Sequence, residues 1–464
     1  MRKILFLQFF MITTVLASEF TGTGFGQTMK EAKHEALSDL SQSIKVEVRS
    51  VFVSHKQATG NSVDSYAEGT IKVTSNLPII GAEFEFFDNP DNIEAVVKLS
   101  PSKAKNLYAQ KLDTLYSEIE TYAKKVSPAQ SSMEKEQLLG ILLNRVNEYD
   151  RYQSVAIVLG VEKIKQPAVN KAAVRSDLLA LQSNIDSMTM AANVLAKSFN
   201  NYNRIYLYPP KQSQSHEITP FAKALKMQLA SGLQTVPTPA QAAYWLMGEY
   251  TESANGVVLS YTLVDVTKRE NSAARTIAIP PKAYNGYRTK PKSISFDKLL
   301  HEGIVVSDKL KVSIGTNKGS EELLFTAGEE INLMVKLNKT GYFYVVGYTQ
   351  TDQGKHAYLL ELEEAPGNAK FIRFVNADDA NRWMSLGTFT VEPPFGIESL
   401  QVIASNHKIS KLPASHYDEE SGYYLIGKGI KEGVAKTRGL IKKKPKNKET
   451  VRTEAVLMFT TMQK

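Results

Sequence analysis

The sequence predicts a multidomain α+β protein that ends in a β-sandwich. Between residues 323 and 406, apolar and polar residues alternate between short polar turns, which is the pattern of half-buried strands. Residues 101–200 instead carry apolar residues at helical spacing. The chain is 464 residues long, which corresponds to roughly three domains. We expect a leader over 1–17 and then four parts, over 18–100, 101–200, 201–303 and 304–464.

The leader has the composition of a secretory signal peptide. Arg2 and Lys3 precede an apolar run from Ile4 to Leu16, and Val15-Leu16-Ala17 supplies small residues for cleavage. The run is too short for a membrane span and is followed at once by polar sequence. The alternative is a buried N-terminal strand or helix. We expect removal of residues 1–17 and a mature protein that is periplasmic or associated with the outer membrane.

Composition restricts the possible chemistry and partners. The chain contains no cysteine, which excludes disulfides, thiol chemistry, cysteine-bound metal and a lipidated N-terminal cysteine. After the leader, no run reaches the ~20 apolar residues of a spanning helix. The net charge is +8. Because we expect export, the basic charge favours an acidic envelope surface or protein as partner and argues against nucleic acid. The alternative is a solvated basic rim without a partner.

Residues 18–100 are predicted to form one helix that covers an antiparallel sheet. Glycines at 22, 24 and 26 indicate a turn, and Thr28 with Glu31 has the spacing of a capping box. The helix that follows has small and apolar residues on one face, which suits close packing on a sheet: Ala32, Ala36, Leu37 and Leu40. Strands are expected over 44–53, 65–76, 80–87 and 93–99.

This first part resembles the N-terminal module of the LPP-twenty lipoprotein family. The residues that carry the resemblance are Gly22-x-Gly24, the alanine-rich helix, and Ile44-x-Val46-x-Val48. The lipidated cysteine of that family is missing here, so the resemblance does not imply a lipid anchor.

Residues 101–200 are predicted to be a helical connector between two globular parts. Ser127-Pro128 and Gln166-Pro167 divide it into three helices, with proline in the first turn of the second and third. The first helix carries an apolar stripe at Leu107, Leu112, Leu115, Ile119 and Tyr122. We expect the stripe to form the core of a helical hairpin or bundle, with a protruding coiled-coil contact as the alternative.

Residues 201–303 are predicted to form an α/β domain. Expected strands lie over 205–208, 234–236, 244–252, 256–266 and 274–279, with a helix over 215–231 and a tight hairpin at 254–256. The helix Phe221-x-x-x-Leu225-x-x-x-Leu229 and the strands Tyr244–Tyr250 and Val258–Asp265 resemble the N-terminal domain of TolB-like envelope proteins. A basic, tyrosine-bearing linker follows over 280–293.

Residues 304–464 resemble the bacterial domain-of-unknown-function family forty-three eighty-four. The residues that carry this resemblance are Leu324-Phe325-x-x-Gly328-Glu329, Gly341-Tyr342-Phe343-Tyr344, Val391-x-Pro393-Pro394-Phe395-Gly396, Ile403-Ala404-Ser405 and Thr437-Arg438-Gly439-Leu440. The family has no established activity. The resemblance implies a β-sandwich interaction module in an envelope or secreted protein.

No catalytic, cofactor-binding or metal-binding residues are predicted. His34-Glu35 and His301-Glu302 both lack the second histidine that would complete a zinc site on one helical face. No Gly-x-Ser-x-Gly motif is present to supply a hydrolase nucleophile. We therefore expect a protein that is not an enzyme, with a hydrolase site hidden in the α/β domain as a remote alternative.

The order of the parts suggests a function. In its first and middle parts it parallels the flagellar assembly protein T family, which implies a periplasmic ring or disk component of the flagellar basal body. We therefore expect a non-enzymatic scaffold or assembly protein of the cell envelope that forms a homo-oligomer or larger assembly. The alternative is an envelope or surface protein that binds a ligand or partner and has no role in a motor.

One candidate contact site lies in the basic C-terminal region. Gly439–Ile441 and Ala455–Thr460 are predicted strands, so residues 442–448 should be an exposed loop between them. The loop either is solvated or meets an anionic surface such as the outer-membrane periphery. The residues predicted to make that contact are Lys442, Lys443, Lys444 and Lys446.

Overall fold

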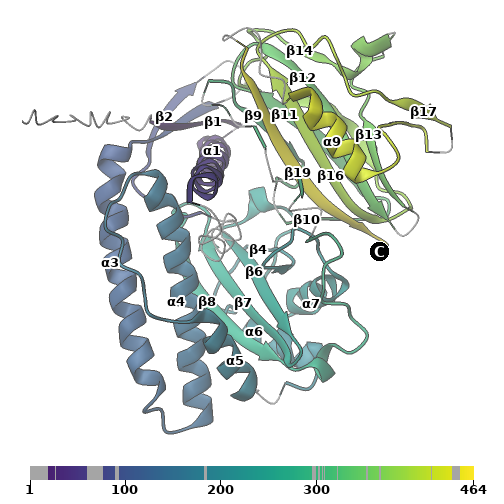
Figure 1. Cartoon of the computed structure of the whole chain (residues 1–464). Coiled ribbons are helices and arrows are strands. Elements are labelled where there is room, and N and C mark those ends of the chain that lie inside the picture. Colours follow the sequence, from purple (N-terminus) through teal and green to yellow (C-terminus); the bar gives the residue numbers. More distant parts are fainter. Residues whose placement is uncertain are drawn as a thin grey trace, which may run out of the picture.

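The chain contains several sheets together with helices, which confirms the predicted α+β multidomain class (Figure 1). The computed structural model describes residues 19–26, 28–59, 77–88, 93–181, 185–294, 299–300, 304–305, 307, 309–320, 322–351, 354–364, 367–419, 421–441 and 450–464. The predicted leader, the predicted strand over 65–76 and the lysine loop over 442–448 lie outside these residues.

The N-terminal unit is a helix on a three-stranded antiparallel sheet, as predicted. Strands β1 (Phe20–Gly26), β2 (Glu83–Asp88) and β3 (Ile93–Leu99) follow the order β1-β3-β2, and helix α1 (Met29–Thr59) packs on β1 and β3. The predicted capping box is present, because the Glu31 N–H donates to Thr28 Oγ1 and the Thr28 N–H donates to the Glu31 carboxylate, both at 3.2 Å.

Two predictions for this unit were wrong. Gly22 and Gly24 lie in strand β1, where a Cβ atom would come within 2.4 Å and 2.1 Å of the backbone of α1 at Ala36. These glycines therefore let helix and strand approach closely. The strand predicted over 44–53 is instead part of α1. Ile44 and Val48 alternate as in a strand, but they are also four residues apart, and both are buried on the same face of α1 as Leu40.

The helical region begins with a hairpin of α3 (Pro101–Val126) and α4 (Ser132–Val158) and continues with α5 (Lys171–Leu181) and α6 (Met188–Lys197). The predicted break at Ser127-Pro128 separates the first two helices. The proline placements were wrong, because α4 starts after Ser131, whose hydroxyl accepts from the Glu134 N–H at 3.1 Å, and α5 starts at Lys171. Ser131 thus caps α4, and Asn170 caps α5, since its Oδ1 accepts from the Ala172 and Ala173 N–H groups at 2.9 Å and 3.2 Å.

The apolar stripe of α3 packs inside the structure. Leu112, Leu115 and Ile119 are buried against α4, whereas Leu107 is exposed and was wrongly placed in the stripe. The same core extends into the N-terminal unit through Tyr108, whose hydroxyl donates to the Pro78 carbonyl at 2.6 Å. It also reaches the central sheet, so the helices share their core with both neighbours.

The central sheet is covered on both faces. Its strand order is β4-β6-β7-β8, with β5 also pairing β6; β4 and β5 run parallel to β6, and β6, β7 and β8 form an antiparallel meander. Helices α6 and α7 pack on one face, and α4 and α5 on the other. The bounds are β4 (Ile205–Leu207), β5 (Lys211–Gln212), α7 (Pro220–Ala230), β6 (Tyr244–Ser253), β7 (Gly256–Asp265) and β8 (Asn271–Ile279).

The predicted elements of this region are largely present. The hairpin at 254–256 joins β6 to β7. The expected strand over 234–236 is reduced to a single bridge between Thr235 and Ile205.

The C-terminal region consists of two sheets packed over a shared core, which is the predicted β-sandwich. The larger sheet has the order β10-β19-β16-β12-β13-β18-β17, with β14 on β12, and the smaller has the order β15-β11-β9. The bounds are β9 (Val312–Thr316), β10 (Leu323–Thr326), β11 (Glu330–Leu337), β12 (Gly341–Thr351), β13 (Lys355–Leu359), β14 (Arg373–Val375), β15 (Met384–Thr390), β16 (Gly396–Ser405), β17 (His416–Asp418), β18 (Tyr423–Leu425), α9 (Ile430–Ile441) and β19 (Arg452–Met462).

One of the two strands predicted beside the lysine loop was wrong. Residues 439–441 end helix α9, whose Ile430 and Val434 are buried four residues apart on the outer face of the larger sheet. Residues 455–460 lie within β19, as predicted.

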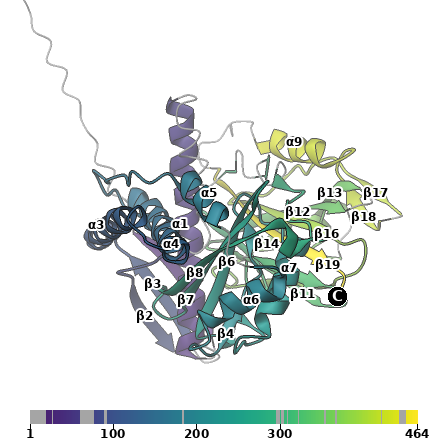
Figure 2. The same ribbon diagram turned by 90° about the horizontal axis from the view of Figure 1, so that it is seen from below.

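The parts converge around α1. Figure 2 shows α1 beside the α3–α4 hairpin, with the central sheet and the C-terminal strands on its other side. This convergence places side chains of the N-terminal unit, the central sheet and the sandwich next to one another.

Candidate functional site

The residues predicted as a contact site, Lys442, Lys443, Lys444 and Lys446, lie outside the part of the chain that the structure describes. Within the described residues, no group of three His, Asp or Glu side chains is placed to hold a metal ion. No helix among these residues has the length and hydropathy needed to cross a bilayer. The structure instead concentrates buried polar groups where its parts meet.

The first junction joins the N-terminal unit to the sandwich. The ammonium group of Lys336, on β11, lies 3.2 Å from Asp39 Oδ1 on α1 and donates to the Thr23 carbonyl at 3.0 Å. Asp39 in turn accepts from the Thr23 N–H at 2.9 Å. The Lys336 side chain is only 3% exposed, and its ammonium group lies 5.1 Å from the centre of the Trp383 ring. The pair is therefore largely buried and hydrogen-bonded, which fixes α1 against β11.

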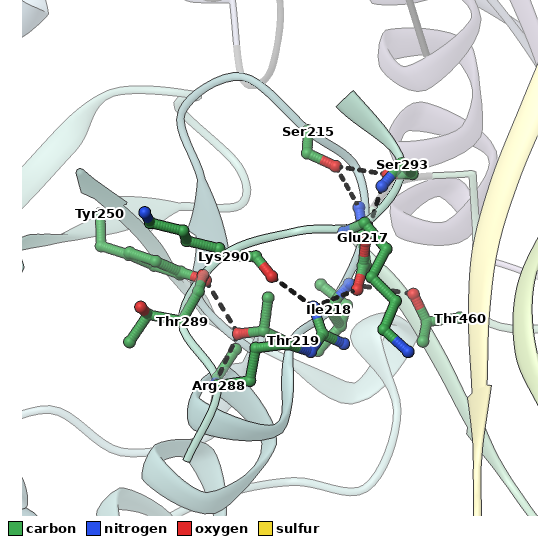
Figure 3. Close-up of polar contacts among 12 residues, drawn as sticks. Ser215, Glu217, Ile218, Thr219, Tyr250, Arg288, Thr289, Lys290, Ser293 and Thr460 are labelled. Atoms are coloured by element: carbon green, nitrogen blue, oxygen red, sulfur yellow. Dashed lines mark hydrogen bonds and ion pairs between the residues drawn. The ribbon is translucent and has the colours of Figure 1, made fainter. Parts of the chain in front are cut away.

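The second junction joins the central region to the sandwich, and Figure 3 shows its polar network. The carboxylate of Glu217, 2% exposed, pairs with Arg288 at 2.8 Å and accepts from the N–H groups of Lys292 and Ser293. The Ile218 N–H donates to Thr460 Oγ1 on β19 at 2.9 Å. The predicted linker over 280–293 is thus fastened to the central region, and that region to the last strand of the sandwich.

The hydroxyl of Tyr250 extends this network. It donates to the Thr289 carbonyl at 2.7 Å and lies 2.8 Å from Thr219 Oγ1, the residue that also caps α7. These bonds join the linker residues Arg288 and Thr289 to the central region, so the network is suited to holding the two together.

A third buried pair connects β5 to the segment before β10. Lys211 and Glu322 lie 3.5 Å apart, with side chains 9% and 3% exposed. The pKa of Glu322 is raised above its ordinary value, because the effect of burial exceeds the opposing effect of the Lys211 charge. Such a pair costs desolvation on both sides and persists only where its geometry is well held.

A cavity of about 220 Å³ lies where all three parts meet. Helix α1 contributes polar side chains, the central region contributes most of the apolar wall and one arginine, and the turn after β9 closes the remaining side. Gln42 on α1 donates to Ser320 Oγ across the cavity rim at 2.6 Å. Its lining includes His34, Lys45, Tyr208, Trp245, Met247 and Arg269.

Arg269 is the unusual member of this wall. It lies in the β7–β8 turn with φ = 58°, where its N–H donates to the Asp265 carbonyl at 2.8 Å. Its guanidinium lies 4.3 Å from the centre of the Trp245 ring. The residue is 9% exposed, and its Nε and Nη2 atoms have no hydrogen-bond acceptor. Burial lowers the pKa of Arg269 to about 10, so the group is still charged at neutral pH.

His34, on α1, lies beside Trp245 in space although the two residues are far apart in the sequence. Its ring meets the indole edge to face, with centres 5.1 Å apart, and neither His34 Nε2 nor Trp245 Nε1 has a hydrogen-bond partner. Burial, with a further contribution from the charge of Arg269, lowers the pKa of His34 to about 3. The imidazole is therefore neutral at physiological pH and does not offset or add to the charge of Arg269.

Sequence reasoning missed this site. It considered His34 only as a metal ligand, treated Trp245 as part of a strand, and did not single out Arg269. These residues come from α1, β6 and a hairpin turn, and no spacing along the chain connects them. An arginine in a tight turn is ordinarily solvated, so only the packing of α1 over this turn reveals that it is buried.

Comparisons with known proteins add little. No family model matches the chain, and no curated protein matches it. Among solved structures, the chain is similar to the crystal structure of the secreted protein HP1454 from the human pathogen Helicobacter pylori, at 12% sequence identity and a TM-score of 0.25, over 61% of this chain and 93% of that one. A likeness at this TM-score supports no argument about fold or function.

Proposed function

We propose that this chain is an exported, non-enzymatic scaffold or assembly protein of the cell envelope. In its more specific form, the proposal is a periplasmic ring or disk component of the flagellar basal body. The observation that carries it is the set of buried polar junctions between the parts. A scaffold has to present several surfaces in a fixed relation, and buried, hydrogen-bonded pairs between modules favour a single arrangement over a flexible string.

Two features of the sequence support the same proposal. The N-terminal segment has the composition of a signal peptide, which supports export. The first and middle parts resemble the LPP-twenty module and a TolB-like domain, in the order found in the flagellar assembly protein T family. The chain would then act through its surfaces, as a homo-oligomer or within a larger assembly at the outer-membrane periphery.

The alternative is an envelope protein that binds a ligand without a role in a motor. The cavity around Arg269 favours it, because concave sites with a few polar groups are where small molecules bind. Deletion of the gene distinguishes the two functions, because only loss of a basal-body scaffold should impair swimming.

Deletion of the gene tests the flagellar form of the proposal. We expect slow or absent swimming and basal bodies that lack a ring near the outer membrane, with both restored by the parent gene. A plasmid carrying Asp39→Ala, which breaks the junction at Lys336, should restore them only partly at equal protein level. Normal swimming with intact basal bodies in the deletion strain would reject the flagellar form and favour the alternative.

A further inference from the structure

We propose that the cavity between α1, β6 and the β9–β10 turn binds a small organic anion, a carboxylate or phosphate monoester, with Arg269 as its counter-charge. This inference goes beyond the scaffold role and does not depend on it. It rests on a buried cation on the cavity wall for which the described protein provides no partner.

The guanidinium of Arg269 is buried without a matching acceptor for all of its N–H groups. A guanidinium removed from water requires an acceptor or a counter-ion, because desolvating an unpaired charge is costly. Arg269 is 9% exposed, and no described Asp or Glu side chain forms an ion pair with it. Its stacking on Trp245 stabilises the cation but supplies no oxygen to its N–H groups. Two of its nitrogens remain without acceptors.

The charged side chains that line the cavity are positive. Among the described residues that line the cavity there is no Asp or Glu, while Lys45, Arg269 and Lys318 each carry a positive charge. Lys318 is committed to Glu329 at 2.9 Å, and the charge of Lys45 acts on the buried Glu322. A bound anion could therefore pair with Arg269 without breaking an ion pair that the protein already forms.

The remaining surface of the cavity combines apolar and polar side chains. Tyr208, Trp245 and Met247 form an apolar wall next to the guanidinium, and α1 presents serine and glutamine side chains opposite. His34 and Trp245 each hold an unmatched polar ring nitrogen there. A cavity of about 220 Å³ suits a small molecule with an anionic head and a short apolar body. Guanidinium groups bind the planar or tetrahedral oxygens of carboxylates and phosphates through paired N–H donors.

The experiment uses the protein without its leader and the fluorescence of Trp245. The chain has two tryptophans, so Trp383→Phe leaves Trp245 as the single reporter. Benzoate and phenyl phosphate are the anionic probes, and inorganic phosphate tests the head group alone. Benzamide has the same apolar body as benzoate without the charge. We expect saturable fluorescence changes with benzoate or phenyl phosphate and at least tenfold weaker binding of benzamide.

Two variants and a matched control locate the binding. Arg269→Gln should weaken binding of the anionic probes by about tenfold or more, since a hydrogen-bonded charge is removed. Ala240→Phe, which narrows the cavity from an exposed position and keeps Arg269, should weaken binding of benzoate and phenyl phosphate as well. Lys268→Gln removes one charge from the same turn at an exposed side chain and should leave binding unchanged.

The unliganded variants give an independent readout. Because Arg269→Gln removes a buried charge that lacks a partner, its thermal midpoint should equal or exceed that of the parent in the absence of probe. A lower midpoint of Arg269→Gln, together with a parent protein that binds no anionic probe, would mean that the protein itself already satisfies the guanidinium, and would overturn the proposal. The proposal also fails if no anionic probe produces a saturable change, if benzamide binds as tightly as benzoate, or if Arg269→Gln and the parent bind equally.

Discussion

Removal of the Asp39 carboxylate should destabilise the protein strongly, because it deprives the buried ammonium of Lys336 of its ion-pair partner. Lys336 is 3% exposed and Asp39 is 16% exposed, so water can replace the lost carboxylate only poorly. Breaking a buried ion pair from one side costs about 3–5 kcal/mol. Asp39 also accepts from the Thr23 N–H at 2.9 Å, a bond worth about 1 kcal/mol. We expect Asp39→Ala to lower the free energy of unfolding by about 4 kcal/mol.

Companion variants separate charge from packing. Asp39→Asn keeps an acceptor for Thr23 and loses only the charge, so its cost should be smaller than that of Asp39→Ala. Adding Lys336→Met to Asp39→Asn removes the unpaired ammonium, and replacing a buried pair by neutral groups is often close to neutral. The double variant should therefore recover most of the lost stability. Glu83→Gln breaks the exposed pair with Lys103, 64% exposed on both sides, and should not move the midpoint.

Urea unfolding followed by tryptophan fluorescence measures these effects, since the Trp383 ring lies beside Lys336. The reasoning is refuted if Asp39→Ala costs less than about 1 kcal/mol, the range of an exposed pair. It is also refuted if the double variant is no more stable than Asp39→Asn.

Three other perturbations have expected outcomes. Gly24→Ala should lower the free energy of unfolding in urea by about 2 kcal/mol or more, because its Cβ would lie 2.1 Å from the Ala36 nitrogen. Gly140→Ala in α4 should be neutral or stabilising, since the nearest atom to its Cβ would be 3.5 Å away. Equal effects of the two substitutions would contradict close packing at Gly24. Burial raises the pKa of Glu398 to about 8, so between about pH 4.5 and 8 the folded state holds a proton that the unfolded state has lost, and the stability of the parent should fall as pH rises through this range. Glu398→Gln should flatten this part of the stability profile. An unchanged slope in the variant would contradict a raised pKa of Glu398. The last perturbation changes the four lysines of the predicted C-terminal loop to Gln: Lys442, Lys443, Lys444 and Lys446. This variant should co-sediment less with isolated envelopes than the parent, and the difference should be largest at low salt. Equal co-sedimentation of variant and parent across a salt series would favour a solvated loop without a contact.

Alternation of apolar residues predicted the strands of the sandwich well. Ile331, Leu333 and Val335 alternate with Asn332, Met334 and Lys336, and all three are buried in β11. The period fails where a short segment fits both patterns. Ile44, Val46 and Val48 alternate with polar residues, as in a strand. The spacing of four between Ile44 and Val48 also suits a helix, and the segment is helical because α1 packs on β1.

Glycine was ambiguous for a similar reason. Gly22 and Gly24 look like turn residues in sequence, and only their neighbours in space show that close approach to α1 requires them. The junctions could not be predicted at all. Lys336 meets Asp39 across about three hundred residues of chain, and a single buried charge in a strand is indistinguishable in sequence from one that faces solvent.

The central claim is that buried contacts hold the N-terminal unit, the central sheet and the sandwich in one arrangement. The absence of cysteine makes a direct measurement possible, because spin labels can be placed at will. Labels on Phe87→Cys in β2 and Phe374→Cys in β14 span the Lys336 junction, and both positions are 48% exposed. Pulsed electron paramagnetic resonance should give one narrow distance distribution, which broadens when Asp39→Ala is added. A broad distribution in the parent, unchanged by Asp39→Ala, would contradict the claim.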